Sequence, residues 1–588
     1  MSKSTIPIEE QSTDRLVAMR PHFLASATHV RLLPRVILVM MLSGLLLLDA
    51  ILPLKGLSFE SALLSHLSSW VLLPTHLLFP HLPTSGPLTA GPLPHPLGIS
   101  LSWWEATLLP GIILLMFLLY ALALYTLPRI IHLRYLIYST LLLGIVCLFF
   151  PVVTSSDAFS YIAYAHMEVI YHLNPLITAP SVLHGDLILK YVYWKDQPSA
   201  YGPTWVVITG FLQWLLGLTG SDGILRMLFT LRVLGLSAHI GSTLLIWSIS
   251  GQLQRITGDI APEKRMRVVL AFAWNPLLLF EACVNAHNDA VLLFLILLTF
   301  WFLLHGPQLS LKWLLPAAVV LALATCLKIN ILIFVPGLLL FLWMQRPRKV
   351  FRLLFISAVY CGVIVLLYMP FWQHGAVLHV LSVNPSTSRV INSPYDFLSQ
   401  LYNALMHVPI HLNAAGEAVA TPVERLMHML SVLIFVPVYA ILCRRATGRA
   451  WRINTIPGLI RWMALVWLLY CAIGSPWFWP WYLVTFFGLY ALVASCTREK
   501  YWGGLNIPLA VGLLAFSSLS LYSFYAWAPA HVSIPDLSGF FWVDLRGLWI
   551  WLIPFLALLW PSLRTLAKLP QLCRGFFTQR VRASTFSR

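Results

Sequence analysis

Long apolar runs separated by short polar connections occupy most of this chain. A membrane-spanning helix needs about 20 apolar residues, and by that measure the pattern predicts about 14 spans, within a range of 13 to 15. The sequence therefore predicts an all-α polytopic membrane protein. The expected span centres lie near residues 45, 116, 144, 238, 276, 297, 321, 338, 362, 435, 466, 488, 514 and 555.

Composition agrees with a membrane class and excludes several others. Of 588 residues, 59% are hydrophobic and 10% are charged, whereas soluble proteins carry about 25% charged residues. A soluble enzyme, a disordered chain and a secreted disulfide scaffold are thereby excluded. The eight cysteines lie in or beside apolar runs, so neither a disulfide framework nor a cysteine-based zinc site is indicated.

The basic residues predict the orientation of the chain. There are 38 Lys and Arg against 21 Asp and Glu, a net charge of +17. Because basic residues concentrate in cytoplasmic loops, they indicate how the chain is oriented in the plasma membrane. The positive charge is therefore not taken as a sign of a nucleic-acid partner. With both termini in the cytoplasm, most of them fall on the inner side, at 129–134, 255–267, 346–352, 444–461 and 564–588.

Two further apolar stretches, 61–79 and 204–219, resemble spans, but a crossing at either would invert every later loop. We therefore expect 203–219 to form an interfacial or re-entrant helix on the outer face. The expected segments are a cytoplasmic N-terminal segment (1–35), the first three transmembrane helices with an outer loop at 55–105 (36–153), an outer loop with interfacial helices (154–224), core transmembrane helices (225–372), an outer loop (373–425), C-terminal transmembrane helices (426–562) and a basic cytoplasmic tail (563–588).

The first polar cluster follows the third predicted span. Asp157, Tyr161, Tyr164 and Glu168 would share one face of a helix, since offsets of 4, 7 and 11 keep to one side. Such a stripe suits contact with a sugar. It is equally typical of a solvated face on a helix that Ser156 or Asp157 caps.

The second cluster is His287, Asn288 and Asp289, between two apolar runs at the predicted outer face. Asn288 or Asp289 is a natural helix cap. Ionisable groups at membrane depth are costly and usually functional, which favours a site. Glu281, one or two turns deeper, is a weaker candidate.

Two basic residues lie on the side that charge bias disfavours. Lys328 is either a snorkelling lysine or a phosphate contact. Arg389, in the 373–425 loop, is either a solvated arginine or a bidentate phosphate ligand. The aromatic run 477–482 is interpreted as an interfacial belt. The predicted topology brings Asp157, the His287 cluster, Lys328 and Arg389 to one face, which indicates a site.

These motifs resemble the bacterial polyprenol-phosphate-mannose-dependent α-(1→6) mannosyltransferases, integral-membrane enzymes of the GT-C superfamily. The resemblance covers roughly residues 135–400. Two positions depart from the family pattern: Ser156 replaces an arginine, and Ala286 replaces a glycine. The matching residues are Ser155, Asp157 and Tyr161; Asn174-Pro175; Tyr201-Gly202-Pro203; His287-Asn288-Asp289; Lys328; Arg389; Ser393-Pro394; and Pro480-Trp481-Tyr482.

The resemblance implies a GT-C-like bundle whose active site faces outward, with Asp157 as the catalytic carboxylate. The donor would be a polyprenyl-phosphate hexose, most simply mannose, and the acceptor a glycan or glycolipid. Donor or substrate contacts are expected from Tyr161, Glu168, Tyr201, His287, Asn288, Asp289, Lys328 and Arg389.

The chemistry requires only one base. A polyprenyl phosphate leaves without a general acid, so one carboxylate that takes the acceptor's proton suffices, and a single displacement inverts the anomeric centre. Lys328 and Arg389 would offset the phosphate charge. His287 and Asp289 are also open as ligands of a divalent cation, although no full ligand set is evident.

Two alternatives remain from the sequence. A lipid-linked oligosaccharide ligase or polymerase would also act at the outer face, but we expect arginine-rich outer loops there. A polyprenyl-lipid flippase or secondary transporter would place its ionisable residues near the membrane midplane.

Overall fold

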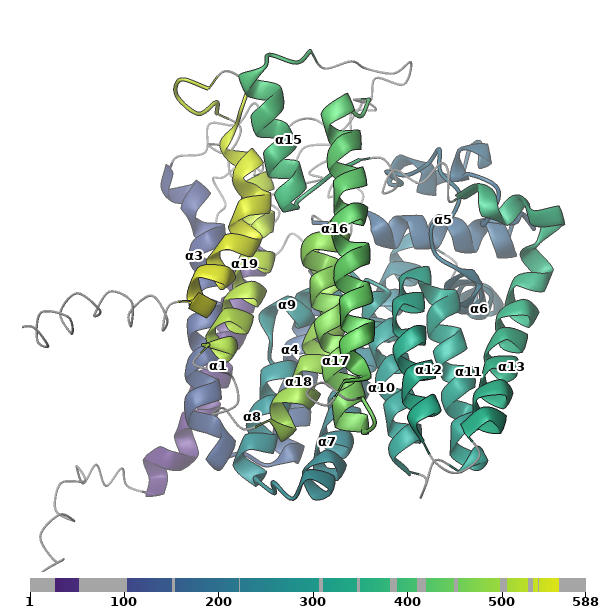
Figure 1. The fold of residues 1–588 in the computed structure, drawn as a ribbon. Helices are drawn as coiled ribbons and strands as arrows, with labels where there is room; N and C mark the ends of the chain where they lie inside the picture. Colours follow the sequence, from purple (N-terminus) through teal and green to yellow (C-terminus); the bar gives the residue numbers. More distant parts are fainter. Residues whose placement is uncertain are drawn as a thin grey trace, which may run out of the picture.

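The computed structural model describes residues 27–51, 103–150, 154–220, 223–305, 310–345, 349–380, 389–409, 419–448, 453–497, 505–526, 532–537 and 539–559. Most of the predicted 1–35 segment and 55–105 loop, the 61–79 stretch and the 563–588 tail lie outside these residues. Within them the chain is all-helical (Figure 1), with only two isolated β-bridges.

The N-terminal half contains α1 (Ala27–Ile51), α3 (Trp103–Thr126), α4 (Leu133–Leu148), α5 (Asp157–Val169), α6 (Pro203–Leu218), α7 (Ile224–Thr257), α8 (Pro262–Ala273), α9 (Pro276–Leu279), the π-helix η6 (Phe280–Val284) and α10 (Asp289–His305). The C-terminal half contains α11 (Leu311–Leu327), η8 (Ile329–Phe334), α12 (Val335–Met344), α13 (Lys349–Tyr368), α15 (Pro394–Leu405), α16 (Pro422–Ala446), α17 (Ile456–Leu469), the π-helix η12 (Tyr470–Gly474), α18 (Leu483–Cys496), α19 (Ile507–Ala526) and a helix within Trp542–Leu559.

The predicted count of about 14 spans is not confirmed. Eight helices of the described chain are long and apolar enough to cross a membrane, or nine if the bent pair Pro262–Ala273 and Pro276–Val284 is one span. The remaining predicted centres fall on apolar helices of 10–17 residues. These helices are shorter because polar or prolyl breaks such as Asn275-Pro276 and Lys328 end them, which hydropathy does not register.

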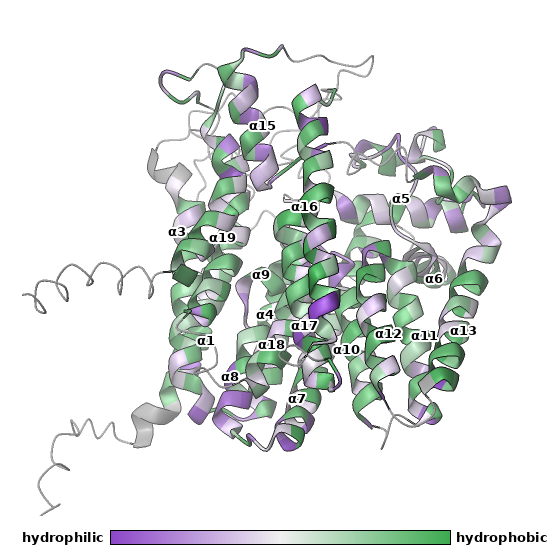
Figure 2. Ribbon diagram, viewed as in Figure 1, coloured by the Kyte–Doolittle hydropathy of each residue, from purple (hydrophilic) through white to green (hydrophobic). Residues whose placement is uncertain are grey.

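The bundle has two chemically different ends. At the end of the bundle where α7 leads into α8, in the lower part of Figure 1, Arg129 pairs with Glu263 at 2.7 Å, and Lys264 Nζ donates to the carbonyl of Thr497 at the end of α18. Arg444 and Arg445 end α16. Figure 2 shows mostly hydrophobic residues along the long helices between the ends. We call this lower end the basic end.

Asp157 lies at the opposite end. α4 begins just after Arg129 and ends before Asp157, and its 16 residues span about 24 Å. The N-terminus of α5 is therefore separated from the basic end by the length of α4. Helix α5 itself lies across the upper part of the bundle (Figure 1). We call this upper end the site end.

α5 and α6 run side by side in the same direction. Tyr201, just before α6, contacts Asp157 at the start of α5, and the rings of Trp205 and Tyr161 meet one turn later at 5.0 Å. Further along, Gly210 lies directly against the carboxylate of Glu168, where a Cβ would overlap its oxygen. The predicted polar stripe of α5 is therefore a packed helix interface and not a solvated face.

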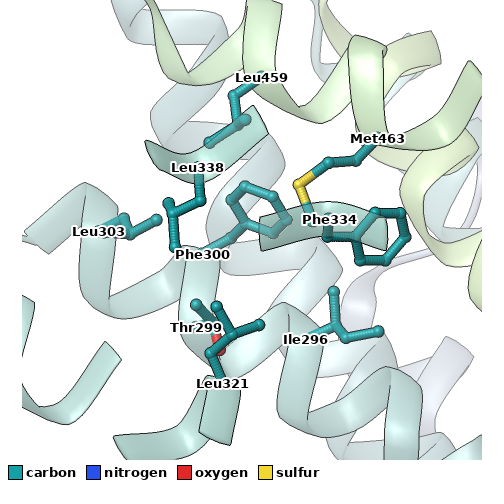
Figure 3. A pocket seen from close by; sticks show the side chains of 9 residues that line it. All are labelled: Ile296, Thr299, Phe300, Leu303, Leu321, Phe334, Leu338, Leu459 and Met463. Carbon is teal, nitrogen blue, oxygen red and sulfur yellow. The ribbon is translucent and has the colours of Figure 1, made fainter. Parts of the chain in front are cut away.

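An apolar pocket lies between helices of the bundle (Figure 3). It is lined by side chains of α10, α11, η8, α12 and α17, among them Phe300, Phe334 and Met463. Its only polar lining residue is Thr299. None of the residues predicted for the site lines this pocket.

Candidate functional site

Asp157 is held at the first position of α5 by neighbours from other segments. The hydroxyl of Tyr201 donates to Asp157 Oδ2 at 2.9 Å, and His287 Nε2 lies 3.8 Å from the same oxygen. Burial and the charge of Asp157 raise the pKa of Tyr201 well above its usual range. Tyr201 therefore keeps its proton and remains a hydrogen-bond donor, which orients the Asp157 carboxylate. The Asp157 side chain remains partly exposed.

The Tyr201-Gly202-Pro203 sequence places that tyrosine. The amide of Gly202 donates to the carbonyl of Leu327 at 3.1 Å, and a Cβ at position 202 would lie 2.1 Å from the carbonyl oxygen of Cys326. Only glycine permits this approach of two backbones. Pro203 then begins α6 with a φ suited to a first helical turn. The turn thus joins α6 to the C-terminus of α11, beside Lys328.

His287 is fixed on both sides of its ring. Its Nδ1 lies 2.8 Å from Glu281 Oε2, and its Nε2 lies 3.1 Å from Ser155 Oγ. The ring stacks on the indole of Trp481, with centroids 3.9 Å apart. His287 is therefore held by three segments that are far apart in the sequence.

The backbone before His287 adopts a conformation that alanine disfavours. Ala286 is buried and has a φ of 55°, in the left-handed region, which costs a non-glycine residue about 1–2 kcal/mol. A glycine at this position would adopt the same conformation without that cost.

We expect Ala286→Gly to raise the free energy of unfolding by about 1 kcal/mol or less, because relief of the left-handed strain is partly offset by the greater freedom of glycine in the unfolded chain. Thermal unfolding of the purified variant in detergent measures this. A lower melting temperature than that of the wild-type protein would contradict the prediction.

Asp289 and Lys328 form a buried ion pair beside His287. Lys328 Nζ donates to both Asp289 oxygens at 2.9 Å, and it lies 4.6 Å from the centre of the Tyr482 ring. The side chain of Asp289 is 1% exposed and that of Lys328 is 11% exposed. Lys328 is thus engaged by a carboxylate and is not a simple snorkelling lysine. An ammonium group has three N–H donors, of which Asp289 takes two.

Unpartnered polar atoms gather between α5, α6 and α10. The side-chain oxygen and nitrogen of Asn288, the hydroxyl of Thr204 and the indole N–H of Trp205 are all buried without a hydrogen-bond partner in the described part of the chain. Buried polar groups normally have partners. These groups are therefore available to a polar ligand or to water next to Asp157.

Glu168 lies apart from Asp157 along α5, and Arg389 interacts with a carboxylate of another segment. Glu168 is 11 positions along α5 from Asp157, about 16 Å away along the helix, and burial raises its pKa to about 7. Arg389 is within electrostatic reach of Glu424 in the first turn of α16. The structure brings together Asp157, Tyr161, Tyr201, His287, Asn288, Asp289 and Lys328.

Sequence reasoning missed part of the site. Trp481 and Tyr482 belong to the run interpreted as an aromatic belt, yet they pack on His287 and Lys328. Tyr522 was not singled out, and its hydroxyl donates to Glu281 Oε1 at 2.8 Å. The Pro480-Trp481-Tyr482 motif was the available signal for the first two, whereas Tyr522 lies in an apolar helix with no distinguishing pattern.

The two residues considered as cation ligands have other partners. Lys328 occupies both oxygens of Asp289, and Glu281 occupies one nitrogen of His287. No group of three or more His, Cys, Asp or Glu residues within the described ranges is arranged to hold a metal ion. The donor set around Asp157 therefore fits hydrogen bonding to a ligand better than metal ligation.

Comparison with known protein families finds one match. Residues 67–345 match the family model described as Alpha-(1->6)-mannopyranosyltransferase, N-terminal domain. The matched range contains Asp157, Tyr201, the 281–289 segment and Lys328. No curated protein and no solved structure matches the chain.

Proposed function

We propose that this chain, whose residues 67–345 match the Alpha-(1->6)-mannopyranosyltransferase, N-terminal domain model, transfers mannose from a polyprenyl-phosphate donor to a glycan or glycolipid acceptor. The family supports mannosyl transfer. The observation that supports the proposed mechanism is the position of Asp157 at the site end. Its carboxylate is held by Tyr201 and is partly exposed, as a general base that must reach the acceptor has to be.

In the proposed reaction, Asp157 accepts the proton of the acceptor hydroxyl as that oxygen bonds to the anomeric carbon. The bond from this carbon to the phosphate oxygen breaks, and its electron pair leaves with the polyprenyl phosphate. Base catalysis of this kind contributes roughly 10²–10⁴-fold. A single displacement inverts the anomeric centre, so a β-linked donor yields an α-linked product.

Lys328 is the proposed contact for the departing phosphate. Its side chain remains 11% exposed beside Asp289, and one of its three N–H groups is free of that carboxylate. A cation at this place stabilises the charge that develops on the bridging oxygen. Arg389 interacts electrostatically with Glu424, and we do not include it in the proposed phosphate site.

The function is tested by incubating purified protein with polyprenyl-phosphate mannose, glucose and galactose in parallel, together with an α-(1→6)-linked mannan acceptor. We expect transfer from the mannose donor and a new α-(1→6) linkage in the product by NMR. Transfer of a preassembled oligosaccharide instead would favour the ligase alternative, and no transfer from any donor would contradict the proposal.

We further propose that the site end faces outward across the plasma membrane and that the termini are cytoplasmic. The basic end, which contains Arg129, Lys264 and Arg444, has the composition of cytoplasmic loops. The parallel packing of α6 along α5 supports a non-crossing, interfacial role for both helices.

Single cysteines test this orientation. In a cysteine-free background, Leu187→Cys and Ile260→Cys place thiols at positions that are 62% and 70% exposed. We expect a membrane-impermeant maleimide to label only the first from outside intact cells, and the second only after permeabilisation. Labelling of both from the same side would mean that α6 crosses the membrane.

A further inference from the structure

Glu281 is a fully buried carboxylate directly behind His287. It lies in the π-helix Phe280–Val284, a distortion that is frequent at functional sites. Its side chain accepts hydrogen bonds from the Tyr522 hydroxyl at 2.8 Å and from Asn285 Nδ2 at 2.9 Å, and Oε2 lies 2.8 Å from His287 Nδ1. Each oxygen therefore has at least one partner.

The partners of Glu281 define where the imidazole carries a proton. With Glu281 ionised, its carboxylate only accepts hydrogen bonds, so we assign the hydrogen between the two side chains to His287 Nδ1. A carboxylate that is 0% exposed also needs a nearby compensating charge or strong donors. Within the described residues, His287 is the one basic side chain that the structure pairs with Glu281.

The other edge of the same ring faces the proposed base. His287 Nε2 is 3.1 Å from Ser155 Oγ and 3.8 Å from Asp157 Oδ2. Ser155 Oγ in turn accepts the backbone N–H of Asp157 at 3.3 Å. Because Trp481 stacks on the ring, the imidazole cannot rotate without losing that contact, and its orientation is transmitted to the first turn of α5.

We propose that Glu281 and His287 are positioning residues for Asp157. The buried carboxylate holds the imidazole in one tautomer and one orientation, and the imidazole holds Ser155 and Asp157 where the carboxylate can take the acceptor's proton. This inference rests on the proposed function of Asp157 as the base. It assigns His287, which the sequence offered as a phosphate, acceptor or metal ligand, to the support of the base instead.

The test compares Glu281→Gln, His287→Gln and the double variant, with steady-state kinetics on polyprenyl-phosphate mannose. Glutamine keeps the shape of Glu281 but removes its charge. We expect kcat to fall about 10- to 100-fold in Glu281→Gln, the scale of losing the partner that orients a functional histidine. The donor KM should stay within about threefold, because neither residue is assigned to binding.

If Glu281 acts through His287, the effects will not add: the double variant should be no slower than His287→Gln alone. Asp186→Asn is the matched control, because it removes the carboxylate from another buried histidine, His166, which lies further along α5 than Asp157. Its kcat should stay within about threefold of wild type. If Glu281→Gln does not fold, His287→Asn is measured in its place, and the same fall in kcat is expected.

Distinct results overturn distinct statements. A wild-type protein that transfers mannose, combined with an unchanged kcat in Glu281→Gln and His287→Gln, would overturn this inference and leave the proposed function standing. Additive losses, or an equal loss in Asp186→Asn, would make the network merely structural and would also overturn it. Absence of transfer by the wild-type protein would overturn both the proposed function and the inference.

Discussion

Replacement of Asp157 by asparagine is expected to lower kcat by about 10²–10⁴-fold, the contribution of a positioned general base. Asparagine is nearly isosteric and still accepts a hydrogen bond from Tyr201, which donates to this side chain at 2.9 Å. It does not take up the acceptor's proton. Folding and insertion should be retained, because the side chain is only partly buried.

The measurement is initial-rate kinetics on purified Asp157→Asn protein, with its elution profile and melting temperature compared to those of the wild type. Asp196→Asn is the matched control, since Asp196 is an exposed carboxylate in the same connection between α5 and α6. Its activity should be unchanged. Transfer by Asp157→Asn within about tenfold of wild type would refute a base at this position.

Removal of Lys328 is expected to have the second large effect, on stability as well as on turnover. Lys328→Gln leaves Asp289, which is 1% exposed, as a buried carboxylate without its cation. Breaking a buried ion pair in this way costs about 3–5 kcal/mol. The loss of the cation beside the departing phosphate should also lower kcat by about 10²-fold or more.

A double variant separates these two effects. In Lys328→Gln/Asp289→Asn neither member of the pair is charged, so much of the lost stability should return, whereas turnover should remain low if the cation serves the phosphate. Lys195→Gln is the control, because Lys195 is exposed in the connection before α6. A double variant with normal turnover would show that the pair is only structural and that the phosphate is bound elsewhere.

The predicted all-α membrane class is confirmed, because the class depends on a quantity summed over the whole chain. A composition of 59% hydrophobic and 10% charged residues is compatible with few other classes of protein. The predicted centres also fall on helices, since apolar runs of this length satisfy their backbone groups as helices in a membrane. The predicted number of full spans is not confirmed, because helix length depends on breaks such as Lys328 between α11 and η8.

Within the site, the sequence was informative where polar residues interrupt apolar runs. Asp157, His287 and Asp289 were selected for that reason, and the structure places them together. Position along an element was a weaker guide. Glu168 shares a helix face with Asp157, but the length of α5 separates them, and α6 covers that face.

By itself, then, the sequence determined the membrane class, the approximate helix positions and most of the polar residues of the site. Only the tertiary structure decided their partners: Lys328 on Asp289, Trp481 on His287, and Glu281 behind that imidazole. Hydrophobic periodicity indicates which residues are buried. It does not indicate which other buried side chain each of them contacts. Which buried groups meet depends on the packing of helices that are distant in sequence, and that packing is set by close approaches such as Gly202 on Cys326.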